Sequence, residues 1–247
     1  VKMFCSGVAR KIDGSSVFHV LTKIQLNLDR FHLKLFKNTF LRWSEKPQES
    51  LSYLWSIYER LVDVEEAVLP HAFANIKLEG TKKCNIIFPR LDPDFAMGVP
   101  SDELLYTLFL AKLEASIKKV NDKGIIHVDL YPSNILWRSF GDDIIIRIVD
   151  WDAATLNDDA FTSDMQVRLA NDINSQYYWK SNGLAEPKCD YWFLFILTNL
   201  SVQERIAMNG NTPAEVNQVY KKSVTRQSQS DPKLKLSFVE WYNQRIN

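Results

Sequence analysis

The most informative stretch of this sequence is GIIHVDLYPSNIL, residues 124–136. It places Asp129 and Asn134 close together, directly after a short apolar run. A second stretch, IVDWD at residues 148–152, again follows an apolar, strand-like run and offers Asp150. Carboxylate and amide oxygens are hard ligands of the kind that Mg²⁺ prefers. These two stretches are therefore the first candidates for a site with chemistry.

Together the two stretches resemble the catalytic loop and the metal-binding motif of the protein-kinase-like superfamily. His127, Asp129 and Asn134 stand at the matching positions of the family's H-R-D-L-x-x-x-N, and residues 150–152 stand at its D-F-G. The resemblance implies that Asp129 is the catalytic base, which orients an acceptor hydroxyl and takes its proton. It also implies that Asn134 and Asp150 bind Mg²⁺, and that ATP is the phosphate donor.

The resemblance further implies a lysine and a glutamate that position the phosphates. Lys34, within FHLKL at residues 31–35, matches the family's V-A-I-K lysine, and Lys37 is its rival. Glu59, on the helix expected next, matches the glutamate that pairs with this lysine. Three other glutamates compete for that role: Glu49, Glu65 and Glu66.

The expected ATP pocket is less complete than in the family pattern. The glycine-rich loop is reduced to DGSSV at residues 13–17, which still allows a tight turn with N–H groups facing phosphate. By resemblance, Phe88 to Leu91 form the gatekeeper and the hinge that faces adenine. The residues expected to contact ATP are Gly14, Val17, Lys34, Glu59, Phe88, Pro89, Leu91 and Leu136.

Several positions depart from the protein-kinase pattern. Val128 replaces the arginine of H-R-D, and Tyr131 replaces the lysine that follows the catalytic aspartate in serine/threonine kinases. Asp152 replaces the D-F-G glycine, and His32 replaces a small residue beside adenine. These departures resemble aminoglycoside- and choline-kinase-like enzymes, and they also leave open a pseudokinase that serves as a binding scaffold.

The region beyond the two motifs points back toward protein kinases. The stretch between Asp150 and Asp190 is about as long as a full activation segment, where a peptide substrate docks. Cys189-Asp190-Tyr191-Trp192 resembles the start of the kinase central helix, and Asp190 would then hold the backbone of the catalytic loop. An N-cap role for Asp190 is compatible with the same residue type.

The expected fold class is α+β, with a bilobal protein-kinase-like architecture. A small mixed β lobe with one helix would span residues 1–91 and bind ATP, and a larger helical catalytic lobe would span residues 92–247. Hydrophobic periodicity predicts a helix over Glu49–Leu69, ended by Pro70, and another over Asp102–Lys119 with Ser101 as its N-cap. Residues 221–235 are rich in polar residues and predict a solvated loop.

Composition limits the possible partners. Thirty basic residues balance thirty acidic ones among 247 residues, and no long basic cluster is present, which argues against nucleic-acid binding. The longest apolar run, residues 191–197, is too short to span a bilayer, so no membrane association is expected. Three widely spaced cysteines fit a reducing compartment, and we expect an intracellular, cytoplasmic protein.

The resemblance therefore implies a phosphotransferase that depends on ATP and Mg²⁺ and uses Asp129 as its base. The favoured acceptor is a serine or threonine hydroxyl of a protein. The alternatives are a small-molecule kinase of the aminoglycoside or choline type, and a pseudokinase scaffold.

Overall fold

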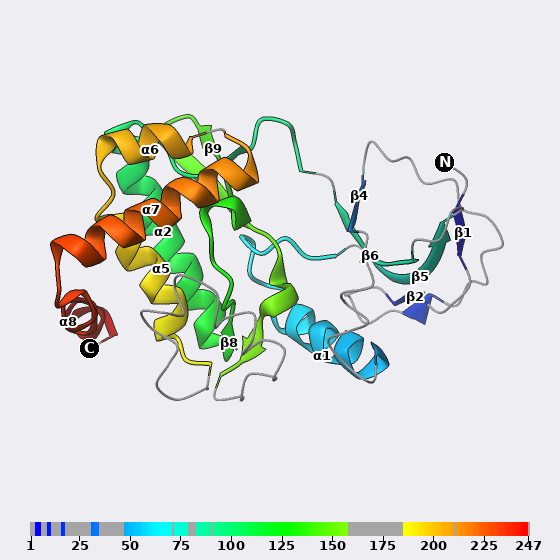
Figure 1. Ribbon diagram of the computed structural model, residues 1–247. Coiled ribbons are helices and arrows are strands. Elements are labelled where there is room, and N and C mark those ends of the chain that lie inside the picture. Colours follow the sequence, from blue (N-terminus) through cyan, green and yellow to red (C-terminus); the bar gives the residue numbers. More distant parts are fainter. Residues whose placement is uncertain are drawn as a thin grey trace. The chain divides into compact units, whose positions relative to one another are not determined.

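The fold of this chain is α+β and divides into two compact units, Val1–Asp92 and Pro93–Asn247 (Figure 1). The sequence placed a boundary after Leu91. The computed structural model describes residues 3–5, 9–10, 16–17, 31–34, 47–70, 72–78, 83–89, 91–157, 185–209 and 211–246.

The first unit contains an antiparallel sheet. In its described part the strand order is β3-β2-β5-β6-β4, and β1 pairs with β5. The strands are β1 (Met3–Cys5), β2 (Ala9–Arg10), β3 (Ser16–Val17), β4 (Phe31–Lys34), β5 (Ala72–Leu78) and β6 (Lys83–Pro89). The pairing of β4 with β6 sets His32 opposite Phe88, two positions singled out by the resemblance to kinases.

The helix of this unit is shorter than its apolar pattern predicts. Helix α1 spans Pro47–Arg60, whereas the prediction extended it to Leu69. The N–H of Val64 donates to the carbonyl of Leu61 at 2.9 Å, and that of Ala67 donates to Val64 at 3.0 Å. Apolar residues three apart suit these i→i+3 turns as well as an α-helix, so the spacing alone could not mark where α1 ends.

The second unit is built around helix α2, Glu103–Asp122. Asp102 is its N-cap, and its Oδ1 accepts from the N–H of Leu105 at 2.9 Å, so the prediction of Ser101 as the cap was wrong by one residue. The Ser101 hydroxyl instead accepts from Asn209 at 3.3 Å. Gly124 follows the helix with φ of 70°, the left-handed conformation that ends many helices.

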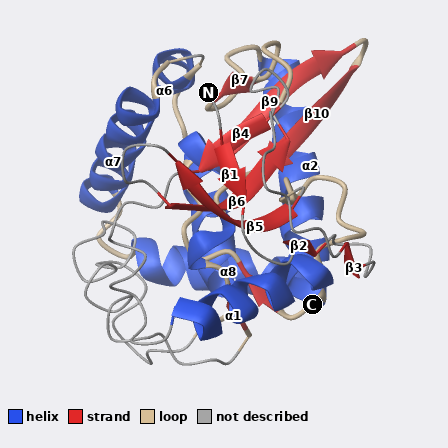
Figure 2. Cartoon of the chain, turned by 90° about the vertical axis from the view of Figure 1, so that its right-hand side faces the viewer, coloured by secondary structure: helices blue, strands red, loops and turns tan. Residues whose placement is uncertain are grey.

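Two small sheets carry the loops of the second unit. Strand β7 (Ala96–Met97) pairs with β9 (Ile135–Phe140), which also forms a long hairpin with β10 (Asp143–Ile148), visible in Figure 2. Strand β8 (Ile125–Ile126) pairs with β11 (Thr155–Leu156). The alternating burial of β10 follows its isoleucines, which point inward at every second position.

Helix α5 (Lys188–Thr198) is the centre of this unit's core. Its residues from Cys189 to Leu197 are buried, and it packs against α2, where the Tyr106 hydroxyl donates to the carbonyl of Leu197. Helix α8 (Leu234–Ile246) adds Phe238, whose ring lies 5.2 Å from that of Trp192. None of the helices in the described part of the chain is both long and apolar enough to cross a membrane.

Helices α6 (Val202–Met208) and α7 (Pro213–Ser230) complete the unit. A capping box begins α7, because Thr212 and Glu215 exchange hydrogen bonds between side chain and backbone. Because α7 extends to Ser230 and α8 begins at Leu234, the prediction of a solvated loop over residues 221–235 was wrong. The buried face of α7 contains Ser223 and Gln227 beside its apolar residues, which hides the helical period from a purely hydrophobic pattern.

Candidate active site

The loop that carries Asp129 is held at its start by Asp190. The two carboxylate oxygens of Asp190 accept from the backbone N–H groups of His127 at 2.9 Å and of Val128 at 3.0 Å. Asn121 of α2 donates to the same carboxylate at 3.1 Å. Asp190 lies inside the first turn of α5 and Pro187 is the N-cap, so the side chain serves the loop and does not cap the helix.

Asp190 supports an unusual backbone conformation at Val128, which has φ of 71°. A β-branched residue rarely adopts this left-handed region, and such strain persists where the surroundings impose it. Burial raises the pKa of the Asp190 carboxyl, while the N–H groups that donate to it lower this pKa in part. The carboxylate therefore fixes the direction in which the chain enters the loop before Asp129.

His127 connects this loop to the segment that carries Asp150. Its ring is buried, with Nε2 3.0 Å from the carbonyl oxygen of Val149, and the ring centre lies 4.6 Å from that of Trp151. Burial lowers the pKa of His127, so the neutral imidazole is the favoured form and Nε2 is its donor. The ring therefore joins two loops without presenting a charge to them.

Hydrogen bonds fix the orientation of the Asn134 side-chain amide. It ends a short 3₁₀ turn (Pro132–Asn134), and its Nδ2 donates to the backbone carbonyl of Asp129 at 2.8 Å. The backbone carbonyl of Asn134 accepts from the N–H of Val149 at 2.9 Å, which brings the segment before Asp150 alongside. Asp150 itself has φ of 64°. The Oδ1 atom of Asn134 accepts from the Ser133 hydroxyl at 3.4 Å and has a second lone pair with which to bind a cation.

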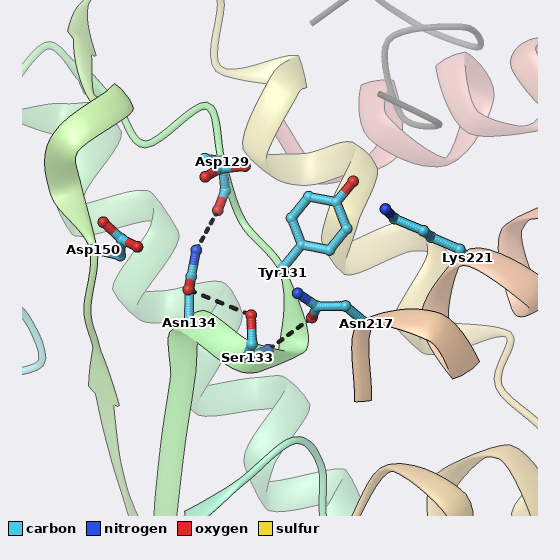
Figure 3. Close-up of a pocket in the computed structure, with 7 residues that line it drawn as sticks. All are labelled: Asp129, Tyr131, Ser133, Asn134, Asp150, Asn217 and Lys221. Carbon is cyan, nitrogen blue, oxygen red and sulfur yellow. Dashed lines mark hydrogen bonds between the residues drawn. The ribbon is translucent and has the colours of Figure 1, made fainter. Parts of the chain in front are cut away.

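These elements surround a hollow of about 300 Å³ (Figure 3). Asp129, Asn134 and Asp150 line it together, so the structure brings three of the four residues assigned to chemistry to one place. Among the described residues, the lining is completed by Tyr131, Ser133, Asn217 and Lys221.

Sequence reasoning missed Ser133, Asn217 and Lys221 as members of this site. Asn217 and Lys221 are one helical turn apart on α7, a spacing that puts two side chains on the same helix face. That signal was available, but it was not used because residues 221–235 were assigned to a loop.

The residues assigned to ATP fall mostly in the first unit. Gly14 and Lys37 lie outside the described residues, as do the residues between 157 and 185. Lys34, Val17, Phe88 and Pro89 lie on described strands, β4, β3 and β6, but their side chains are outside the described part. Leu91 and Leu136 are half-buried.

Glu59 lies on α1 with an exposed side chain that accepts a hydrogen bond from the indole of Trp55. Its expected pairing with Lys34 remains a prediction. Of the competing glutamates, Glu49 also lies on α1, whereas Glu65 and Glu66 follow the end of that helix.

The chemistry of the hollow fits a divalent cation that shares its ligands with a substrate. Within the described part of the chain, no cluster of three or more His, Cys, Asp and Glu side chains could hold a metal by itself. Asn134 and Asp150 offer one amide oxygen and one carboxylate. Mg²⁺ commonly takes one or two such protein ligands and completes its coordination with phosphate oxygens and water.

No family model matches this chain, and no curated protein matches its sequence.

Proposed function

We propose that this chain is a phosphotransferase with a bilobal protein-kinase-like fold, which moves the γ-phosphate of ATP to a hydroxyl group. One observation carries the proposal: Asp129, Asn134 and Asp150, which the two sequence motifs single out, line the same hollow. Their anchoring contacts come from residues of the same motifs, because His127 and the backbone of Asn134 both bind Val149. An accidental motif match would not require this convergence.

Each residue then has a role that its chemistry supports. Asp129 orients the acceptor hydroxyl and takes its proton as the acceptor oxygen bonds to the γ-phosphorus and the bond to ADP breaks. Asn134 and Asp150 would hold Mg²⁺, which when bound neutralises the charge that develops on the phosphate oxygens. Lys34 would anchor the phosphates, and Glu59 would position Lys34.

Two classes of acceptor fit this chemistry. The first is a serine or threonine of a protein, which the length of the segment between Asp150 and Asp190 favours. The second is a small hydroxyl compound, which the replacement of the kinase lysine by Tyr131 favours. Fold by itself does not choose between them.

The test is transfer of label from γ-labelled ATP with Mg²⁺ to protein acceptors and to small alcohols. Asp129→Asn should lower the transfer rate by about 10²–10⁴, the usual contribution of general base catalysis, while ATP binding is kept. Asp122→Asn is the matched control, because Asp122 is exposed and forms only a surface pair with Lys118 at 3.4 Å.

Equal transfer rates for wild type and Asp129→Asn would contradict the assignment of the base. Binding of ATP with Mg²⁺ but no transfer to any acceptor, unchanged by Asp129→Asn, would identify the pseudokinase alternative.

A further inference from the structure

The side of the hollow away from Asp150 is formed by helix α7. Asn217 Oδ1 accepts from the backbone N–H of Ser133 at 3.3 Å, which ties α7 to the turn that carries Asn134. One turn further along, Lys221 Nζ lies 5.9 Å from the centre of the Tyr131 ring. Asn217 is thus bonded to the loop, and the ammonium group of the exposed Lys221 lies close to Tyr131 of the same loop.

The packing of Tyr220 holds this part of α7 beside the loop. Tyr220, which lies between Asn217 and Lys221 in the sequence, is fully buried, and its ring meets that of Tyr131 edge-on at 5.3 Å. The same ring lies 5.5 Å from Phe193 of α5. Aromatic contacts of this geometry restrict both partners, so the turn of α7 that carries Asn217 and Lys221 is held against the loop.

In Figure 3, Asp150 lies on one side of the hydrogen-bonded pair Asp129 and Asn134, and Tyr131, Asn217 and Lys221 lie on the other side. In an in-line transfer the attacking and leaving oxygens lie on opposite sides of the phosphorus. If phosphate approaches from the side of Asp150, the acceptor occupies the side of α7.

Lys221 gives the acceptor side of the hollow a positive charge. Lys221 is the basic side chain among the described lining residues, and it takes part in none of the ion pairs formed in the described part of the second unit. Asp129 and Asp150 would repel an anionic acceptor unless a nearby cation offset them. A lysine serves as a point charge for carboxylate or phosphate groups.

We propose that Lys221 and Asn217 bind an anionic group of the acceptor, so that the substrate is a hydroxyl compound bearing a carboxylate or a phosphate. The inference rests on the proposed phosphotransferase function. Lys221 supplies the charge. Asn217 supplies amide N–H donors, because Ser133 already engages its oxygen. The negative charge expected on this acceptor is opposite to the positive charge on the amine-bearing acceptors of aminoglycoside- and choline-kinase-like enzymes.

Binding of small probes to the full chain tests the charge preference without turnover. Calorimetry with D-glycerate and sn-glycerol 3-phosphate is compared with glycerol and ethanolamine. Wild type should bind the anionic probes at least about tenfold more tightly than glycerol, and Lys221→Gln should remove this difference, as expected for the loss of a charge-assisted contact. Lys222→Gln is the matched control, because Lys222 is the next residue of α7 and is exposed.

Transfer assays identify the source of the anionic group. Small hydroxy acids and phosphorylated alcohols form one arm, and a serine peptide flanked by aspartates, paired with one flanked by arginines, forms the other. A preference for the anionic member of either arm should depend on Lys221, appearing mainly in KM, and Lys221→Glu should reverse it.

Two results would overturn the inference. One is anionic probes that bind wild type no better than glycerol, and the other is equal effects of Lys221→Gln and Lys222→Gln. ATP binding with Mg²⁺ is measured on the same preparations. If it is intact, either result removes the acceptor assignment alone, whereas absence of ATP binding removes the proposed function itself.

Discussion

The Asp190 carboxylate accepts a hydrogen bond from the backbone N–H of Val128 at 3.0 Å, and Val128 has φ of 71°. Val128, whose left-handed backbone conformation must be imposed by its surroundings, is thus bound directly by the buried carboxylate of Asp190 on helix α5. Asp129, the candidate base, is the next residue. The position of the base therefore depends on a contact formed far away in the sequence.

Replacing Asp190 tests this dependence. Asp190→Asn keeps one acceptor oxygen but leaves one buried N–H of the loop without a partner, which should lower the free energy of unfolding by about 1–3 kcal/mol in urea titrations. Asp190→Ala should cost more, because both N–H groups lose their acceptor.

Glu186→Gln is the control for Asp190→Asn. Glu186 lies just before α5 and forms an ion pair with Lys188 at 3.8 Å, and such surface pairs contribute at most about 1 kcal/mol. Equal losses for Asp190→Asn and Glu186→Gln would mean that the loop does not depend on the buried carboxylate.

His127 should make the stability of the protein depend on pH. Burial lowers its pKa in the folded state below the ordinary 6.5, so below that pH the unfolded chain binds a proton that the folded chain does not. Stability should therefore fall as the pH decreases from about 6.5, with a slope of up to about 1.4 kcal/mol per pH unit. Denaturant titrations between pH 5 and 8 measure it.

His127→Gln isolates this contribution, because glutamine can still donate to Val149 but does not titrate. The slope attributed to His127 should vanish in the variant, while the other titrating groups contribute to both proteins alike. Parallel pH profiles for the two proteins would show that the imidazole takes up a proton equally well in the folded chain.

Gly98 has a backbone role next to the site. Its φ is 91°, its N–H donates to the carbonyl of Pro132 at 3.2 Å, and a Cβ at this position would overlap the carbonyl oxygen of Met208. Gly98→Ala would force a residue with a Cβ into the left-handed conformation and would also push the backbone of Met208 away. We expect a loss of about 3 kcal/mol or more in the free energy of unfolding.

Gly141 provides the matched comparison. It also has positive φ, 60°, but a Cβ there would meet nothing within 4 Å. Gly141→Ala should cost only about 1–2 kcal/mol, the strain of the left-handed conformation. Similar losses for the two variants would contradict the close approach of Gly98 to Met208.

Asn134 should separate metal binding from the geometry of the loop. Asn134→Ala removes the amide oxygen and should raise the Mg²⁺ concentration needed for half-maximal ATP binding by about 10–100-fold, the usual effect of disturbing a metal site. Asn134→Asp keeps an oxygen ligand but loses the donor to the carbonyl of Asp129, so it should bind Mg²⁺ and transfer phosphate slowly.

Asn211→Ala is the control for these Asn134 variants, since Asn211 is exposed, lies outside the lining of the hollow, donates to the carbonyl of Ala207 at 2.6 Å and should not change the Mg²⁺ requirement. An unaltered Mg²⁺ requirement in Asn134→Ala would exclude it as a ligand.

The sequence was informative where a local pattern has one physical solution. Helix α2 has a long apolar period, and acidic residues mark its start, so its existence was predictable. Its ends were misplaced: the N-cap is Asp102 and not Ser101, and the helix ends at Asp122 and not at Lys119. The hydrogen bonds that Asp190 accepts from the backbone of the loop were also predicted, through the resemblance to kinases.

Other features depend on packing that no local pattern records. The end of α1 was misplaced because residues spaced by three suit both a helix and successive turns. Helix α7 was missed because Ser223 and Gln227 are buried among its apolar residues, and the amide nitrogen of Gln227 donates to the carbonyl of Ile196 on α5 at 3.0 Å. Without α7, the contribution of Lys221 to the hollow could not be predicted.

The most direct test of the proposed site is calorimetric titration of ATP at several Mg²⁺ concentrations into wild type and Asp150→Asn. Asp143→Asn is the control, because Asp143 is an exposed acid of β10 paired with Lys112 at 2.7 Å. The affinity of wild type and of Asp143→Asn for ATP should increase with the Mg²⁺ concentration, whereas the affinity of Asp150→Asn should not. ATP binding that is absent from wild type, or equally dependent on Mg²⁺ in Asp150→Asn, would contradict a phosphotransferase site at this hollow.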